Sequence, residues 1–170
     1  LNCVWCHNPE SKRKEVEISF DAGQCIACDS CIDACPEGAL SRDNVYFIHR
    51  DKCTLCFKCE NVCPTGALSR VGVQMSVEEI IKAIKKDKPF FKTSGGGATL
   101  SGGEPTINIG FISELMEGLK KEEINTLIET CGFFKQERFM EKIYPNTDLI
   151  YFDIKIMDRD DHIKYCGVPN

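Results

Sequence analysis

Residues 25–36 read CIACDSCIDACP, and residues 53–64 repeat the same arrangement as CTLCFKCENVCP. Each copy has the spacing Cys-x2-Cys-x2-Cys-x3-Cys followed by proline, and the copies continue alike as CPEGALSR and CPTGALSR. The second copy begins 28 residues after the first, so this part of the chain is an internal duplication. The two copies hold eight of the twelve cysteines in the sequence.

The spacing of these cysteines favours a metal centre. Four cysteines within eleven residues suit a shared metal centre better than disulfides, which need Cα atoms within a narrow range of distances and matching side-chain directions. A pair of zinc sites is the alternative, because Cys-x2-Cys also binds zinc. A third closely spaced cysteine and a fourth before proline, both present twice, instead match the bacterial ferredoxin pattern.

In that pattern the first three cysteines of a copy bind one [4Fe-4S] cluster, and the fourth binds the other cluster. One predicted cluster is therefore bound by Cys25, Cys28, Cys31 and Cys63. The second predicted cluster is bound by Cys53, Cys56, Cys59 and Cys35. We expect an α+β ferredoxin-like domain over residues 21–70, whose two clusters form an electron conduit.

The composition narrows the classes of partner. The chain has 170 residues, is 42% hydrophobic and carries a net charge of -5. Its length allows one sizeable core, and its charge argues against a nucleic-acid partner. It has no run of 18 apolar residues and no positively charged leader, so we expect no membrane partner and a cytoplasmic location.

Helical and strand patterns alternate after residue 70. Ser76 and Glu79 have the spacing of a capping box, which predicts a helix over residues 76–86. Further helices are expected over residues 108–121 and in QERFMEKI. Strands are expected in GGGATLSGGEPT, in INTLIETCG and in DLIYFDIK, the last as a strand buried on both faces. This order predicts parallel β-α units, in an open doubly wound sheet or in part of a barrel.

Charged or backbone-exposing residues stand where three of these strands end. They are Gly102-Gly103-Glu104, then Glu129-Thr130, and then Asp153 and Lys155. The glycines would let a ligand approach the main chain. Glu129 and Asp153 should lie on neighbouring strand ends, where two carboxylates repel unless a cation lies close by. The three strand ends together predict a binding site.

Six stretches in this order carry a family resemblance. They are CVWCHNPE, the duplicated cysteine module, GGGATLSGGEP, ETCG, DIKIMD and HIKYCGVPN. The sequence resembles the glycyl-radical-enzyme activating enzymes, which are radical S-adenosylmethionine (SAM) proteins of the pyruvate formate-lyase activase type. It most resembles the branch that carries an inserted ferredoxin domain.

The resemblance implies a partial radical SAM (β/α) barrel with an inserted two-[4Fe-4S] ferredoxin-like domain. Residues 1–20 would begin the radical SAM core with its cluster loop, and residues 71–170 would form the partial barrel. The catalytic [4Fe-4S] cluster of the family is held by Cys-x3-Cys-x2-Cys, and Cys3 and Cys6 match its second and third ligands. The first ligand would lie upstream of Leu1, so we expect the chain to be truncated at both ends.

The resemblance also implies a SAM site. Gly102, Gly103 and Glu104 match the motif that holds the methionine part of SAM. Four further residues match positions around SAM and a nearby monovalent cation: Glu129, Thr130, Asp153 and Lys155. The family more often has Asp at the position of Glu129. Trp5 either borders the adenine or packs against the barrel mouth.

Structural roles are expected for the three histidines and for the two remaining cysteines. His7 is expected to have a structural role in its loop, with hydrogen bonding to a cluster ligand as the alternative. His49 and His162 are expected at the surface or at helix ends. Cys131 and Cys166 are expected to be spare thiols, although either could replace the missing cluster ligand.

The function implied by the resemblance is reductive cleavage of SAM to methionine and a 5'-deoxyadenosyl radical. That radical would remove a hydrogen atom from a backbone glycine of a glycyl-radical enzyme, the protein partner. An electron donor such as flavodoxin or ferredoxin would supply this oxidoreductase under anaerobic conditions. The alternatives are a ferredoxin-type electron-transfer protein and a radical SAM enzyme that acts on a small molecule.

Overall fold

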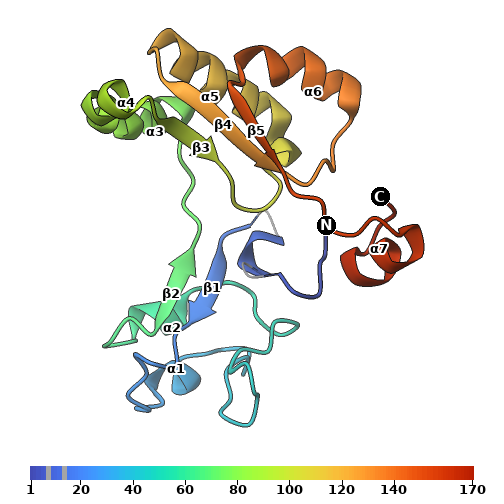
Figure 1. Cartoon of the computed structure of the whole chain (residues 1–170). Helices are drawn as coiled ribbons and strands as arrows, with labels where there is room; N and C mark the ends of the chain where they lie inside the picture. Colours follow the sequence, from blue (N-terminus) through green and yellow to red (C-terminus); the bar gives the residue numbers. More distant parts are fainter. Residues whose placement is uncertain (7–8, 13–14) are drawn as a thin grey trace. The chain divides into compact units, whose positions relative to one another are not determined.

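The structure is a computed structural model that describes residues 1–6, 9–12 and 15–170 (Figure 1). The chain divides into two compact units. One unit, called the core unit below, combines Leu1–Lys12 with Gln74–Asn170. The other, the cysteine-rich unit, is Arg13–Val73. The expectation for His7 lies outside the described residues.

The cysteine-rich unit has a two-stranded antiparallel sheet, in which β1 (Glu17–Phe20) pairs with β2 (Leu68–Val71). The short helices α1 (Ser30–Asp33) and α2 (Lys58–Asn61) each contain the third cysteine of one copy. The buried residues at its centre are Ile18, Leu40, Phe47, Ile48 and Leu68. Because β1 pairs with β2, the unit extends beyond the expected range of 21–70 at both ends.

The duplication is visible in the backbone of the cysteine loops. Ala27 and Asp29 have φ of 60° and 59°, and the equivalent residues Leu55 and Phe57 have φ of 55° and 56°. Positive φ is uncommon for residues other than glycine, and it costs free energy unless the surroundings hold it. Both copies therefore have left-handed backbone at the same two positions between their first three cysteines.

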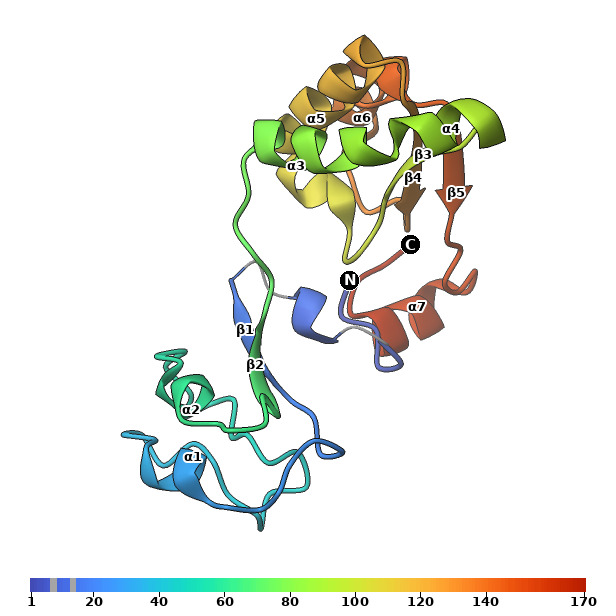
Figure 2. The same ribbon diagram turned by 90° about the vertical axis from the view of Figure 1, so that its left-hand side faces the viewer.

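The core unit contains a parallel sheet in the order β3-β4-β5, formed by Gly97–Leu100, Asn125–Thr130 and Leu149–Phe152. Leu100 is in register with Ile128, and Thr130 is in register with Phe152. The helices of the unit are α3 (Val77–Ile84), α4 (Lys88–Ser94), α5 (Ile109–Lys121), α6 (Gln136–Lys142) and α7 (Arg159–Cys166). Figure 2 shows the same elements from a second side. The predicted alternation of helices and parallel strands is confirmed.

The capping box at the start of α3 is also confirmed. The Ser76 hydroxyl accepts a hydrogen bond from the Glu79 main-chain N–H at 3.2 Å, and the Glu79 carboxylate accepts one from the Ser76 N–H at 2.8 Å. Two details differ from expectation. Helix α4 follows α3 and was not predicted, because its sequence KPFFKTS has no helical apolar stripe. The 3-10 turn Lys85–Asp87 separates the two helices.

The prediction that DLIYFDIK is buried on both faces is wrong. β5 lies at the edge of the sheet, since β4 is its neighbour among the described strands. Tyr151 is 55% exposed and Phe152 is 57% exposed. The apolar character of the segment therefore does not show that other elements cover both faces of this strand.

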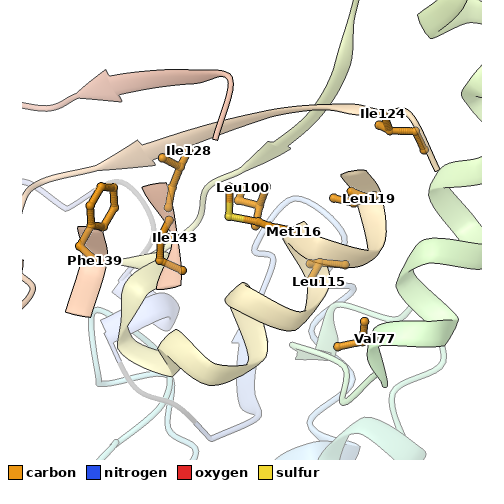
Figure 3. Packing of buried hydrophobic residues seen from close by; sticks show 9 residues of the cluster. All are labelled: Val77, Leu100, Leu115, Met116, Leu119, Ile124, Ile128, Phe139 and Ile143. Carbon is orange, nitrogen blue, oxygen red and sulfur yellow. The ribbon is translucent and has the colours of Figure 1, made fainter. Parts of the chain in front are cut away.

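The hydrophobic core of this unit lies between the sheet and α5. Leu115, Met116 and Leu119 of α5 are buried in one cluster with Leu100 of β3 and Ile128 of β4 (Figure 3). These α5 residues recur at the spacing that places them on one face of a helix. The same cluster includes Val77, Phe139 and Ile143, so α3 and α6 pack on either side of α5.

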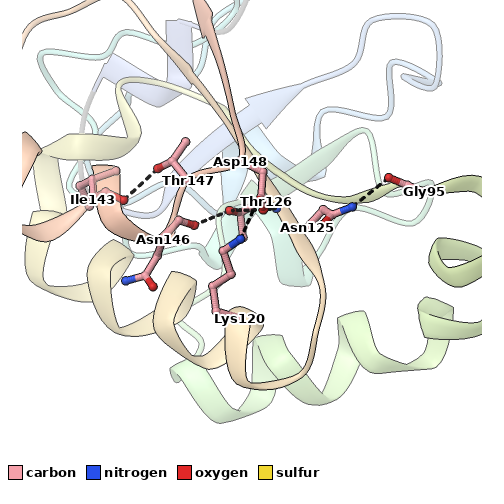
Figure 4. A network of polar contacts seen from close by, with 8 residues as sticks. All are labelled: Gly95, Lys120, Asn125, Thr126, Ile143, Asn146, Thr147 and Asp148. Carbon is pink, nitrogen blue, oxygen red and sulfur yellow. Dashed lines mark hydrogen bonds and ion pairs between the residues drawn. The ribbon is translucent and has the colours of Figure 1, made fainter.

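A polar network holds the amino-terminal ends of β4 and β5 (Figure 4). The Asp148 carboxylate accepts a hydrogen bond from the Thr126 main-chain N–H at 2.8 Å and forms an ion pair with Lys120. The Thr126 hydroxyl donates to the main-chain oxygen of Asn146 at 2.5 Å. Thr126 is buried, so its N–H and hydroxyl groups cannot bond to water, and these protein acceptors satisfy them instead.

None of the helices formed by the described residues is long and apolar enough to cross a membrane.

Candidate functional site

A cavity of about 560 Å³ opens where the three parallel strands of the core unit end. Its volume is in the range of about 300–1,000 Å³ that is typical of small-molecule sites. Every residue predicted for the catalytic and SAM sites lines it: Cys3, Trp5, Cys6, Gly102, Gly103, Glu104, Glu129, Thr130, Asp153 and Lys155. These residues come from the first six positions and from three strand ends, and the fold brings them together.

Glu104 is held by donors from two elements. Its carboxylate accepts hydrogen bonds from the N–H of Thr106 at 3.2 Å and from the Thr106 hydroxyl at 2.6 Å. The Thr130 hydroxyl lies 2.9 Å from both carboxylate oxygens and donates to one of them. That hydroxyl in turn accepts from the Gly132 N–H at 3.1 Å. A carboxylate surrounded by donors in this way is fixed in position.

Cys131 adds two more donors to the same carboxylate. Its main-chain N–H lies 2.9 Å from Glu104 Oε2, and its thiol lies 3.1 Å from the same oxygen. Burial, and then the hydrogen bond to the Glu104 carboxylate, raise the pKa of Cys131 to about 11. The thiol is therefore protonated at neutral pH and serves as a hydrogen-bond donor.

The other two carboxylates have separate partners. The Ser101 hydroxyl donates to Glu129 Oε2 at 2.5 Å across the β3-β4 pair. Asp153 forms an ion pair with Lys155, and this hydrogen bond raises the pKa of Lys155. Part of the expected repulsion between Glu129 and Asp153 is thus relieved by a lysine of the same cavity.

The two positions before Glu104 require glycine for different physical reasons. Gly102 has φ of +113°, a conformation that side-chain-bearing residues rarely adopt, and a Cβ there would meet nothing within 4 Å. A Cβ on Gly103 would lie 2.7 Å from the main-chain oxygen of Ser11, which is closer than real contacts allow. Gly102 therefore permits the turn, whereas Gly103 permits the close approach of the Ser11 main chain.

The segment with Cys3 and Cys6 is tied to the carboxyl-terminal end of α7. Asn2 N–H donates to the oxygen of Cys166 at 2.9 Å, and Val4 N–H donates to the oxygen of Tyr165 at 3.0 Å. Cys3 is buried, and Lys12 donates to its main-chain oxygen at 2.9 Å. These bonds place both thiols at the cavity.

Trp5 lines the cavity and is 46% exposed, with its ring centroid 6.4 Å from that of Tyr165. Cys166 is fully buried and does not line the cavity; burial, and then contact with Cys3, raise its pKa. The expectation that His162 lies at the surface or at a helix end is wrong. It is buried within α7, with Nδ1 2.5 Å from the oxygen of Val168.

Several residues of the site were not predicted. Ser101, Thr106, Cys131 and Lys12 all bond to predicted site residues, and Tyr151 lines the cavity beside them. Ser101 belongs to the motif SGGE and Cys131 to the motif ETCG, so the signal was their position at a strand end. Lys12 carries no such signal, because its contact with the main chain of Cys3 joins residues nine positions apart outside any predicted element.

The eight cysteines of the duplicated module surround two small cavities in the cysteine-rich unit. One cavity is lined by Cys25, Cys28, Cys31 and Cys63. The other is lined by Cys35, Cys53, Cys56 and Cys59. In the part of the chain that the structure describes, no group of three or more His, Cys, Asp or Glu is arranged to hold a single metal ion. Four thiols around one space fit the donor set of a [4Fe-4S] cluster.

The sulfur atoms of the two cysteines that precede proline accept hydrogen bonds. The Ala39 N–H donates to Cys35 Sγ at 3.3 Å. Hydrogen bonding from the main chain of Leu68, and also from the Thr65 hydroxyl, lowers the pKa of Cys63. A thiol with a lowered pKa is more readily available as a thiolate ligand.

Comparison with known families identifies two family models in the chain. The model of the 4Fe-4S dicluster domain matches residues 24–67, and the model of the radical SAM superfamily matches residues 50–170. The chain belongs to the radical SAM superfamily.

Similar proteins narrow the class further. The trans-4-hydroxy-L-proline dehydratase activating enzyme of Clostridioides difficile is 41% identical over 100% of this chain and 57% of its own length. The (2S)-3-sulfopropanediol sulfolyase activating enzyme of Bilophila wadsworthia is 44% identical over 99% of this chain and 57% of its own length. The choline trimethylamine-lyase activating enzyme of Oleidesulfovibrio alaskensis is 38% identical over 100% and 56%. The chain thus spans just over half the length of these relatives.

A solved domain of a pyruvate-formate lyase-activating enzyme from Bacteroides vulgatus is 29% identical, with a TM-score of 0.40 over 44% of this chain and 46% of that one.

Proposed function

We propose that this chain is part of a glycyl-radical-enzyme activating enzyme, which cleaves SAM reductively and generates a glycyl radical on a partner enzyme. The observation that carries the proposal is the single cavity lined by all ten residues predicted for the catalytic and SAM sites. The relatives support it, because those described above are activating enzymes of this kind by name. A cytoplasmic location remains part of the proposal.

Two cysteines at the cavity fit the ligands expected for a [4Fe-4S] cluster. Cys3 and Cys6 would supply two thiolates to the catalytic [4Fe-4S] cluster, with a third expected four positions before Cys3. When bound, the reduced cluster supplies the electron that breaks the sulfonium carbon–sulfur bond of SAM, giving methionine and a 5'-deoxyadenosyl radical. The residues of this chain bind and orient SAM for that step.

Glu104 is the acceptor we assign to the cationic methionine part of SAM. Its carboxylate is already oriented by Thr106, Thr130 and Cys131, so little ordering remains when the ligand arrives. Gly102, in its open turn, leaves the main chain accessible beside it. Preorganised groups of this kind lower the cost of binding because their conformational freedom is lost on folding.

Glu129 and Asp153 are the residues we assign to the neighbourhood of a monovalent cation. Glu129 retains the carboxylate where the family more often has Asp, and Ser101 fixes one of its oxygens. Lys155 balances the charge of Asp153. Tyr151 and Trp5 would then lie beside the nucleoside part of SAM, because both are aromatic residues that line the cavity.

The three parallel strands would belong to a radical SAM barrel, and the cysteine-rich unit would be inserted between its cluster loop and its first described strand. Two [4Fe-4S] clusters in that unit would relay electrons from a donor such as flavodoxin or ferredoxin toward the catalytic cluster. The crossed ligand sets are supported by the two four-cysteine cavities.

The test is production of 5'-deoxyadenosine from SAM by the natural protein that contains this chain, reconstituted anaerobically with iron and sulfide and reduced chemically. Product, together with a glycyl radical detected by electron paramagnetic resonance on an added partner enzyme, is the expected result. Product without a glycyl radical on any partner would favour a small-molecule substrate. No product, with all clusters present by iron content, would favour the electron-carrier alternative.

A further inference from the structure

The two four-cysteine cavities are built from equivalent positions of the duplicated module. Ala67 and Leu68 line the first cavity, beside Cys63, and their equivalents Ala39 and Leu40 line the second, beside Cys35. Because these lining residues are equivalent, a residue that differs between the two copies changes the surroundings of one cavity and not of the other.

One difference lies two residues after the cysteine that precedes proline. In the sequence it is the single change between CPTGALSR and CPEGALSR. Thr65 lines the first cavity, and its hydroxyl oxygen lies 3.8 Å from the sulfur of Cys63. Glu37 occupies the equivalent position and lines the second cavity. A hydroxyl donor at one site is thus replaced by a carboxylate at the other.

The other charges beside the two cavities do not cancel this contrast. Asp29 also lines the first cavity, but its carboxylate is bonded by the Arg42 guanidinium, with Nε 2.8 Å from Oδ1, and Arg42 lines the same cavity. Phe57 is the equivalent of Asp29 in the second cavity, and it lies under the guanidinium of Arg70 at 4.3 Å from the ring centroid. Arg70 is in turn ion-paired with Glu60. Each cavity therefore borders one compensated ion pair, and the carboxylate of Glu37 is an additional negative charge at the second cavity.

These differences act on reduction potential in the same direction. Adding an electron makes a cluster more negative, so a nearby carboxylate disfavours reduction and a hydrogen bond to a ligand sulfur favours it. Building on the cluster assignment of the proposed function, we propose that Glu37 and Thr65 set the two sites at different reduction potentials. The site of Cys25, Cys28, Cys31 and Cys63 has the higher potential, and the site of Cys35, Cys53, Cys56 and Cys59 has the lower potential.

The functional consequence is an order of filling. A single electron delivered to the cysteine-rich unit resides at the site bordered by Thr65, and the site bordered by Glu37 is reduced only at lower potential. The one-electron-reduced unit therefore has a defined location for its electron. The ligand spacing alone does not specify this asymmetry, because it is the same in both copies.

The experiment is an anaerobic redox titration of the reconstituted protein, followed by electron paramagnetic resonance. The module offers matched variants: Glu37→Thr makes both copies read CPTGALSR, and Thr65→Glu makes both read CPEGALSR. Thr65→Val removes only the hydroxyl. Glu141→Gln, which removes an exposed charge in the core unit, is the control.

The wild-type unit is expected to titrate in two separate waves. Glu37→Thr should move the lower wave upward and narrow the gap, whereas Thr65→Val and Thr65→Glu should move the upper wave downward. Glu141→Gln should move neither. Coincident waves in the wild type, or no movement in Glu37→Thr with full iron content, would overturn the inference while leaving the proposed function intact. Absence of iron from the unit would overturn both.

Discussion

Cys131 donates two hydrogen bonds to one oxygen of Glu104, from its main-chain N–H at 2.9 Å and from its thiol at 3.1 Å. The two residues belong to different strand ends, and the bonds link the SGGE turn after β3 to the end of β4. Only the thiol bond can be removed by substitution. Cys131 is therefore a positioning residue for the carboxylate that we assign to SAM.

Cys131→Ala should weaken SAM binding about 5-fold, since a net hydrogen bond contributes about 1 kcal/mol and each 1.4 kcal/mol is about tenfold in Kd. Cys131→Ser should retain most of the affinity, because its hydroxyl can donate to the same oxygen. Equilibrium dialysis with SAM on iron-loaded protein measures both variants. If Ser is as weak as Ala, the thiol acts through its volume and not through the hydrogen bond.

The raised pKa of Cys131, about 11, predicts slow alkylation near neutral pH. The thiolate is the reactive form, so its fraction at pH 8 is on the order of 10⁻³ and the rate should rise with pH. Glu104→Gln removes the negative charge beside the thiol, and the rate at Cys131 should increase. Peptide mapping after timed iodoacetamide treatment reads Cys131 separately from the other cysteines. An unchanged rate in the Gln variant would leave burial as the whole cause.

Glu104→Gln and Cys28→Ala should separate the SAM site from the electron relay. Glu104 contacts Thr106, Thr130 and Cys131, so its substitution should weaken SAM binding and leave the iron content intact. Cys28 lines a four-cysteine cavity, so its loss should lower the iron content of the cysteine-rich unit. Iron analysis and SAM binding are measured on both variants. Equal iron loss in both would contradict the division into two sites.

Asp148→Ala should destabilise the start of β4. The substitution leaves the buried N–H of Thr126 without its acceptor, which typically costs about 1–3 kcal/mol. Hydrogen exchange of the β4 amides, followed by mass spectrometry, measures this loss locally. Glu141→Ala, at an exposed position on α6, is the control and should leave β4 protection unchanged.

Gly103→Ala should impair the site, whereas Gly110→Ala should not. A Cβ at residue 103 would lie 2.7 Å from the Ser11 oxygen, so the backbone must shift, at a typical cost of about 1–3 kcal/mol. A Cβ at residue 110 would meet nothing within 4 Å in the first turn of α5. Thermal unfolding and SAM binding compare the two variants. Equal behaviour would show that the segment around Ser11 accommodates the side chain without cost.

Much of the local structure could be predicted from the sequence because it depends on neighbours in the chain. Short-range spacing predicts the capping box at Ser76 and the parallel strands before Glu104 and Glu129. It also predicts the order of helices and strands along the chain. α4 escaped prediction because its residues KPFFKTS lack periodicity. The exposure of β5 was not predicted because hydrophobicity does not report which side chains other elements cover.

By itself, the sequence determined the ligand spacing of the duplicated cysteine module, the residues at three strand ends and the resemblance to activating enzymes. Only the tertiary structure decided which groups touch: Cys131 with Glu104, Ser101 with Glu129, Lys12 with the main chain of Cys3, and Glu37 and Thr65 with separate cavities. The physical reason is that spacing along the chain governs turns and caps. Contacts between distant residues depend on strand register and on how the connecting segments pack.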